Sequence, residues 1–188
     1  MNNRRSGFHQ LVTVRKDAYA IKHIKNPSEE LQLIAVKIDG HVIQYIENPT
    51  EKVKLEAVKE DGDALEHIKD ASIKIQLAAI KKNPYAIRYI QKLSKEIQLT
   101  AVTQYDGHAI EFIKNPSKQI QLAAVRKNAK AIRWIQNPSE QAQLTAVKKN
   151  GLVLQYIKDA SEQVQLAAFK QNEEAISFIT DYTEKIQI

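Results

Sequence analysis

The stretch NPSEELQLIAVKIDGHVIQYIE, residues 26–47, is followed at once by a variant of itself, NPTEKVKLEAVKEDGDALEHIK, residues 48–69. Self-similarity at a fixed period of this length is typical of repeat proteins, in which each repeat is one supersecondary unit. The pattern continues every 22 residues, except for one step of 23 between Gln98 and Gln121. Because the period leaves no room for a linker, it predicts a single repeat domain over residues 1–188.

The period divides the chain into a modified first repeat, seven full repeats and a terminal fragment. Their bounds are 1–25, 26–47, 48–69, 70–91, 92–114, 115–136, 137–158, 159–180 and 181–188. Repeat arrays normally end in a polar capping repeat, but here Ile186 and Ile188 have no following hairpin to cover them. We therefore expect either a shortened chain or end-to-end self-association of two copies at the C-terminus.

Each repeat carries two helix signals. The Ser or Thr of the Asn-Pro-Ser motif is a candidate N-cap, because its hydroxyl can accept a hydrogen bond from an unpaired backbone N–H. These residues are Ser28, Thr50, Ser72, Ser94, Ser117, Ser139, Ser161 and Thr183. A second N-cap, before a shorter helix, is predicted at Asp17, Asp39, Asp61, Asn83, Asp106, Asn128, Asn150 and Asn172. Pro84 directly after Asn83 supports this second helix, since proline is favoured at the first helical position.

The two helices of one repeat are too short to be stable alone. A helix of about ten residues is marginal in water, and one hairpin cannot bury the apolar face formed by Leu31, Leu33, Ile34, Ala35 and Val36. Stacking similar hairpins builds a continuous core. The sequence therefore predicts an all-α fold, an α-solenoid of about eight stacked two-helix repeats.

The composition predicts a soluble, cytoplasmic protein. No stretch approaches the roughly 18–20 apolar residues of a membrane span, and the N-terminus MNNRRSGFHQ lacks the apolar region of a secretory signal. The chain has no cysteine, which excludes disulfides and thiolate metal sites. Its formal net charge of +6 favours an anionic partner or simply maintains solubility.

The repeats resemble an uncharacterised family of short helical repeats in phage and bacterial proteins, whose units follow the pattern Asn-Pro-Ser-Glu-Glu-Val-Gln-Leu-Ala-Ala-Val-Lys. Residues 10–188 carry the resemblance, and the sequence departs from the pattern at Asp70, at Asp159, at 92–94 and in the 23-residue repeat. The resemblance implies a fold similar to HEAT repeats and a phage origin, with action in the host cytoplasm. It implies no reaction.

Basic residues recur at one repeat position, and we refer to them as the basic ridge. Thr103 is the exception to the row. The ridge could bind nucleic acid, nucleotides or an acidic protein face. Alternatively, lysine near a helix C-terminus is favoured by the helix dipole, and repetition copies it. The ridge consists of Arg15, Lys37, Lys59, Lys81, Arg126, Lys148 and Lys170.

Two further rows repeat along the chain. An aromatic row could stack nucleobases or anchor a partner, or it could form a half-buried rim that packs on the neighbouring repeat. It consists of His23, Tyr45, His67, Tyr89, Phe112, Trp134, Tyr156 and Phe178. A glutamine row is expected to bond adjacent repeats or the turn backbone through its amides. It consists of Gln32, Gln76, Gln98, Gln121, Gln143 and Gln165.

The 23-residue repeat is a candidate binding centre. It combines a changed motif at residues 92–94, the loss of the ridge lysine at Thr103 and one inserted residue. An insertion is most easily accommodated at a turn, and neutral drift in that loop is the alternative explanation. The residues that this hypothesis places around the gap in the ridge are Tyr105, His108, Arg88, Arg133 and Trp134.

The sequence contains no recognisable catalytic or metal-binding motif. The five histidines lack metal-ligand spacing, and neither a nucleophile elbow nor a phosphate-binding glycine loop is present. We therefore expect a non-enzymatic scaffold without cofactor or metal that binds a macromolecule, in the first place a protein such as a host defence effector. Binding of nucleic acid or an anionic nucleotide through the basic ridge is the alternative, and no membrane association is expected.

Overall fold

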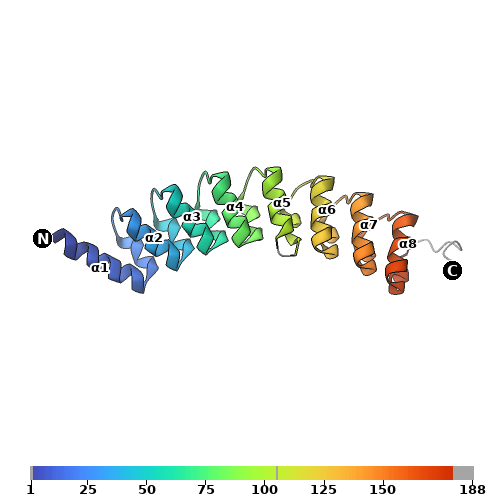
Figure 1. Cartoon of the computed structure of the whole chain (residues 1–188), viewed down its shortest axis with the longest axis horizontal. Coiled ribbons are helices and arrows are strands. Elements are labelled where there is room, and N and C mark those ends of the chain that lie inside the picture. Colours follow the sequence, from blue (N-terminus) through green and yellow to red (C-terminus); the bar gives the residue numbers. More distant parts are fainter. Residues whose placement is uncertain (1, 105, 180–188) are drawn as a thin grey trace. The chain divides into compact units, whose positions relative to one another are not determined.

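The computed structural model describes residues 2–104 and 106–179, with side chains from Gly7 onward. In these ranges every regular element is helical and no strand occurs: α-helices alternate with short 3-10 helices, labelled η (Figure 1). The bounds in the first half are α1 Asn2–Lys16, η1 Ala18–His23, α2 Glu29–Ile38, η2 Gly40–Tyr45, α3 Glu51–Glu60, η3 Gly62–His67, α4 Ile73–Lys82 and η4 Pro84–Tyr89. Those in the second half are α5 Lys95–Thr103, η5 His108–Phe112, α6 Lys118–Lys127, η6 Ala129–Trp134, α7 Glu140–Lys149, η7 Gly151–Tyr156, α8 Glu162–Gln171 and η8 Glu173–Phe178.

The helices form two compact units, Met1–Lys92 and Leu93–Ile188. In each unit every α-helix packs on the next α-helix along the chain, and every 3-10 helix packs on the next 3-10 helix. In the first unit, α2, α3 and α4 follow one another side by side in this way (Figure 1). The predicted all-α stack of eight helical repeats is therefore confirmed. The single domain over residues 1–188 stays a prediction.

The predicted Ser and Thr N-caps begin the α-helices. In six repeats the hydroxyl oxygen accepts a hydrogen bond of 3.3–3.4 Å from the backbone N–H three residues further on. Ser161 occupies the cap position of α8 without this bond, and Thr183 lies outside the described residues. The caps therefore mark where each helix begins. Because helices of about ten residues are marginal alone, most of their stability must come from packing.

The predicted Asp and Asn caps begin the 3-10 helices. In seven repeats the side-chain oxygen accepts a bond of 2.8–3.1 Å from the N–H two residues further on. Each η element then ends where a backbone N–H bonds to the carbonyl three residues back, as from Ile46 to Ile43. The second helix of the hairpin is thus a tight 3-10 helix, the form that proteins use for short helical segments.

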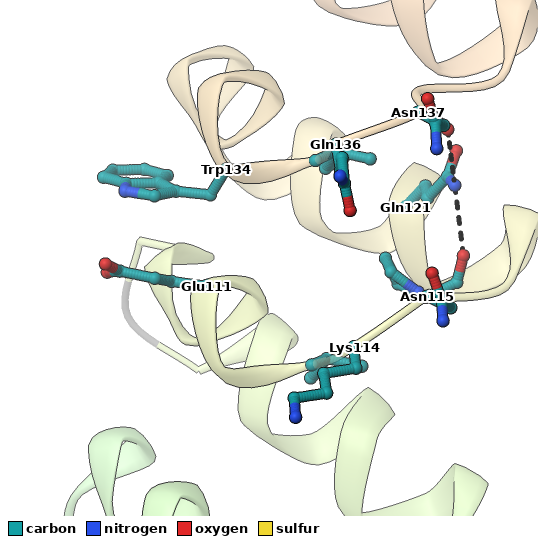
Figure 2. Close-up of a pocket in the computed structure, with 10 residues that line it drawn as sticks. Glu111, Lys114, Asn115, Gln121, Trp134, Gln136 and Asn137 are labelled. Atoms are coloured by element: carbon teal, nitrogen blue, oxygen red, sulfur yellow. Dashed lines mark hydrogen bonds between the residues drawn. The ribbon is translucent and has the colours of Figure 1, made fainter.

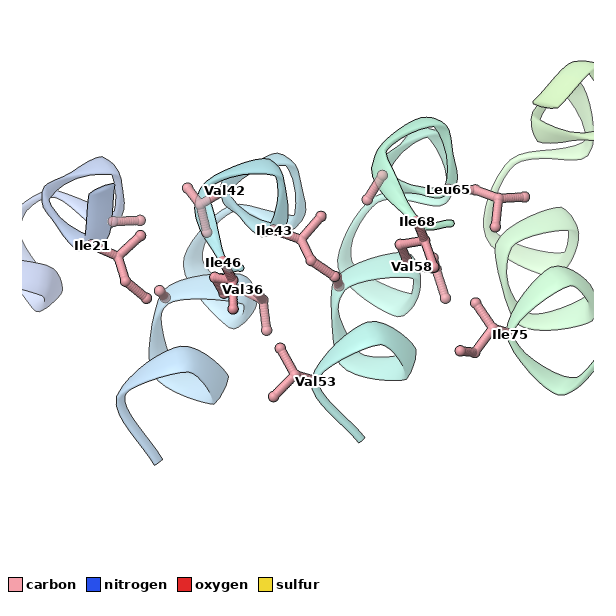
Figure 3. Packing of buried hydrophobic residues seen from close by; sticks show 14 of the residues in the cluster. Ile21, Val36, Val42, Ile43, Ile46, Val53, Val58, Leu65, Ile68 and Ile75 are labelled. Atoms are coloured by element: carbon pink, nitrogen blue, oxygen red, sulfur yellow. The ribbon is translucent and has the colours of Figure 1, made fainter. Parts of the chain in front are cut away.

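Both helices of a repeat contribute to one apolar core. In the repeat 26–47, Leu31, Ala35 and Val36 face inward from α2, and Val42 and Ile43 face inward from η2. Figure 3 shows the same arrangement in the following repeats of the first unit, where Val53 and Ile75 occupy the position that Leu31 has in the repeat 26–47. Full burial of such a side chain contributes about 1.5–3 kcal/mol, so neighbouring repeats stabilise helices that would be unstable alone.

The extra residue of the 23-residue repeat lies in the turn between α5 and η5, as predicted. Helix α5 has nine residues, whereas α6, α7 and α8 have ten. Gly107 takes over the N-cap position with φ of 78°, which corrects the prediction of Asp106, although Asp106 still accepts the His108 N–H at 3.2 Å. Ile97, Val102 and Ile110 remain buried. The insertion is absorbed by the turn and the core is unchanged.

Candidate partner-binding surface

The glutamine row is structural. In six repeats the side-chain amide nitrogen donates a bond of 2.8–3.0 Å to the carbonyl five residues earlier, in the loop before the helix. Gln121 also donates to the Asn137 carbonyl at 3.4 Å and accepts the Ser139 N–H at 2.8 Å. It therefore ties two successive loops together (Figure 2). The prediction that these amides bond adjacent repeats or the turn backbone is confirmed: all six bond the turn backbone, and Gln121 also bonds the next repeat.

The residues of the basic ridge all lie exposed in the last turn of an α-helix. Arg15, Lys37, Lys59 and Lys81 belong to the first unit, and Arg126, Lys148 and Lys170 belong to the second. Among these seven side chains, all within the described residues, only Lys59 forms an ion pair, at 2.7 Å from Glu56. Whether the ridge binds a partner stays a prediction.

A different lysine satisfies helix C-terminal carbonyls in the second unit. Lys149 donates to the Arg126 carbonyl at 2.5 Å and to the Lys127 carbonyl at 3.1 Å, both in the last turn of α6. Cationic side chains near a helix C-terminus commonly stabilise it through hydrogen bonds of this kind. No such bond is found for the ridge side chains Arg126, Lys148 and Lys170 in the described residues, which leaves their charges directed to solvent.

Charge is distributed unevenly along the repeats. Residues 112–158 of the second unit contain nine basic residues and one carboxylate, Glu140, which accepts a hydrogen bond from the Ser161 hydroxyl at 2.9 Å. The corresponding residues 23–69 of the first unit contain six basic and ten acidic residues. The basic set of the second unit is Lys114, Lys118, Arg126, Lys127, Lys130, Arg133, Lys148, Lys149 and Lys158. We call this set the basic surface.

The aromatic row packs between repeats. A residue near the start of one 3-10 helix contacts the row residue of the next repeat: Tyr19 meets Tyr45 with ring centroids 5.9 Å apart, and His41 meets His67 at 5.8 Å. In the second unit His108 meets Trp134 at 4.1 Å. Five of the eight row members are half-buried, whereas His23, Tyr45 and Phe178 are exposed. The half-buried rim that the sequence suggested is therefore confirmed only in part.

Arg133 stands out within the basic surface. Its guanidinium lies 4.9 Å from the centre of the Trp134 ring and 5.4 Å from that of Tyr156, so it contacts aromatic rings of two successive repeats. The side chain is exposed. Among the described residues no carboxylate pairs with it. The result is a positive group held in place by rings and open to solvent.

Arg88 occupies the same repeat position in the first unit, but its charge is compensated. Its guanidinium lies 4.7 Å from the Tyr89 ring, donates to the Tyr89 hydroxyl at 2.7 Å and pairs with Asp63 at 3.4 Å. The hydrogen bond to Tyr89 raises the pKa of Arg88, and Asp63 acts in the same direction. At the position of Asp63 the second unit has His108. Arg133 therefore lacks the carboxylate that Arg88 has.

A groove of about 520 Å³ lies between the ends of η5 and η6. Trp134 and Glu111 project side by side at one end of it, and Lys114, Asn115 and Asn137 belong to the loops at the other (Figure 2). Grooves of about 610, 510 and 790 Å³ recur between successive repeats of the first unit, where Tyr45, His67 and Tyr89 replace the tryptophan. The groove is thus a general result of stacking, and the grooves differ from one another in the side chains that line them.

The structure brings together part of the predicted binding centre. His108, Arg133 and Trp134 are neighbours in the second unit. Tyr105 lies outside the described residues, and Arg88 belongs to the first unit, where it pairs with Asp63. The sequence reasoning named Tyr156 as a member of the aromatic row but did not include it in the binding centre, where it contacts Arg133. It missed the replacement of Asp63 by His108. An alignment of the repeats, comparing charge two residues after each Asp or Asn cap, could have revealed that replacement.

Comparison with protein-family models, curated proteins and solved structures found no match for this chain. Within residues 2–104 and 106–179, no helix has the length and apolar character required to span a bilayer. In the same ranges, no three His, Asp or Glu side chains are grouped so that they could hold a metal ion.

Proposed function

We propose that this chain is a non-enzymatic repeat scaffold that binds a protein partner through an acidic surface of that partner. The carrying observation is the excess of nine basic residues over one carboxylate across residues 112–158. Within the described residues none of these nine side chains forms an ion pair. The positive electrostatic potential of such a surface accelerates association with an acidic surface and disfavours binding of basic surfaces.

The arrangement of the aromatic side chains favours a protein over a nucleic acid. Base stacking requires free aromatic faces along a groove, but Trp134 is already contacted by the His108 ring and by Arg133. The ridge cations follow the repeats, and stacked helices lie about 8–10 Å apart. In duplex DNA, by contrast, the phosphates of one strand succeed each other about every 3.4 Å along the helix axis. A protein surface can match the wider spacing because its carboxylates are not evenly placed.

The resemblance of the repeats to phage and bacterial repeat proteins extends this proposal. If the chain is encoded by a phage, the acidic partner would be a host defence effector in the host cytoplasm, which the scaffold would block by occupying its surface. This extension rests on the resemblance of the repeat pattern alone.

The proposal can be tested with charge reversals that change net charge equally in the two units. The variant Arg126→Glu, Lys148→Glu, Lys170→Glu reverses ridge charges of the second unit. The control Lys25→Glu, Lys52→Glu, Lys74→Glu reverses three exposed lysines of the first unit. Binding to fluorescein-labelled oligoglutamate, followed by anisotropy at about 50 and about 200 mM salt, should fall at least about tenfold for the ridge variant and less than about threefold for the control.

Two results would contradict the proposal. Equal losses in both variants would show that only net charge matters, and tight binding of single-stranded oligonucleotide without binding of oligoglutamate would assign the surface to nucleic acid.

A further inference from the structure

We infer that Arg133 is the anchor of the basic surface and recognises a carboxylate side chain of an acidic protein segment. This inference rests on the proposed function and adds the residue and the chemical group that it recognises. The other cations of the surface would then supply attraction without geometric selection.

The position of Arg133 pre-orients its guanidinium. Arginine is planar and stacks on aromatic faces, while the N–H groups at its edge remain able to form two parallel hydrogen bonds to a carboxylate. Contacts to both Trp134 and Tyr156 restrict the side chain in the free protein. Because less rotational freedom is lost on binding, a pre-oriented donor contributes more affinity than a mobile one.

The first unit shows which group this position accepts. There Asp63, which belongs to the preceding repeat, pairs with the stacked Arg88 at a distance of 3.4 Å. In the second unit the equivalent position is His108, whose ring meets the Trp134 ring in a T-shaped contact and whose Nδ1 lies 2.8 Å from Asp106. Among the described residues, no carboxylate therefore pairs with Arg133 as Asp63 pairs with Arg88. A partner carboxylate would restore the pair that the repeat architecture already forms once.

The surroundings limit where that carboxylate can lie. Lys130 is exposed on η6, the same helix that carries Arg133, and adds positive charge. Glu111 lines the groove together with Trp134, so a carboxylate inside the groove would meet a like charge. The partner segment is therefore expected to cross η6 and η7, over Arg133, with the groove as its border.

The test replaces each stacked arginine by lysine, which keeps the charge and removes the planar fork. Fluorescein-labelled oligoglutamate is titrated with the full chain, and anisotropy gives the dissociation constant. Arg133→Lys should bind about tenfold more weakly than the wild type. Arg88→Lys, whose arginine is already paired with Asp63, should stay within about twofold. Trp134 is the only tryptophan of the chain, so its fluorescence emission in the wild type should change on binding. Melting temperatures of all variants check that they fold.

Each outcome separates the anchor from the proposed function. If the wild type binds oligoglutamate and Arg133→Lys binds equally well, the surface is a diffuse electrostatic one and the anchor is wrong. If the wild type does not bind oligoglutamate, the proposed function fails and the anchor with it. Binding restricted to single-stranded oligo-dT would transfer the site to phosphate recognition and overturn both.

Discussion

The side chain of Gln121 accepts the backbone N–H of Ser139 at 2.8 Å, so an amide in one repeat fixes the residue that begins the helix of the next. Gln121 is 7% exposed, the one polar side chain among the buried residues described. Its amide nitrogen bonds two carbonyls, those of Pro116 and Asn137.

Replacing Gln121 by leucine should destabilise the second unit strongly. The substitution leaves the Ser139 N–H and two loop carbonyls without their partner, and each buried unpaired group costs about 1–3 kcal/mol. We expect a loss of about 2–4 kcal/mol in the free energy of unfolding by urea. Gln143→Leu, where one bond to the Pro138 carbonyl is lost, should cost about 1 kcal/mol. Similar losses in the two variants would show that the contacts to the next repeat contribute nothing.

Gly107 should resist substitution because of its backbone. Its φ is 78°, and a Cβ at this position would approach the Ala124 carbonyl oxygen to 2.9 Å. Gly107→Ala should therefore lower stability by about 1–2 kcal/mol. Gly7 is the matched control, since it lies in α1 and a Cβ at this position would have open space around it. Gly7→Ala should stabilise by up to about 1 kcal/mol, so calorimetry should show changes of opposite sign in the two variants.

Truncation of a core residue should cost far more than truncation of an exposed residue of the same type. Ile43 is 2% exposed and Ile38, in the same repeat, is 48% exposed. Ile43→Ala should reduce the free energy of unfolding by about 2–5 kcal/mol through lost burial and a cavity. Ile38→Ala should change it by less than about 0.5 kcal/mol. Denaturant unfolding of both variants tests the assignment, and equal costs would contradict the packing.

The Lys59–Glu56 pair predicts a small dependence of stability on acid. The hydrogen bond from Lys59 lowers the pKa of the Glu56 carboxyl below its usual 4.5. The pair therefore stabilises the fold above that pH, and its contribution is lost as the pH falls through the lower folded-state pKa. Because Lys59 is largely exposed, the contribution at neutral pH should be only about 0.3–0.5 kcal/mol. Glu56→Gln should show this loss at pH 7 in urea unfolding, and the difference from wild type should vanish in strong acid.

The repeat boundaries and both kinds of N-cap could be predicted because one 22-residue pattern states them several times. The 3-10 geometry of the second helix could not, since an Asp or Asn cap followed by apolar residues begins an α-helix equally well. The left-handed backbone conformation of four residues could not be predicted either. They are Asn26, Asp70, Asn115 and Asp159. Asn and Asp tolerate that conformation without requiring it, and other repeats have Asn at the same position with φ below zero.

The candidate site was only partly predictable for a similar reason. Periodicity identifies which residues share a row, and it placed Arg133 beside Trp134. It does not show that a residue two positions after one cap contacts the aromatic residue six positions after the next. That diagonal contact, seen between His108 and Trp134, depends on how the 3-10 helices stack. Unless this diagonal contact is known, the difference between Asp63 and His108 does not reveal that Arg133 lacks a paired carboxylate.

The contacts between consecutive repeats have a consequence for how this protein can evolve. Within each unit every substantial contact joins elements of the same repeat or of adjacent ones. A substitution on one 3-10 helix therefore alters one segment of surface and leaves the remaining core as it was. The exchange of Asp63 in one repeat for His108 in another is a change of this kind, in which the same scaffold neutralises one arginine and exposes its equivalent. The surface charge can thus change in one repeat at a time, without a new fold.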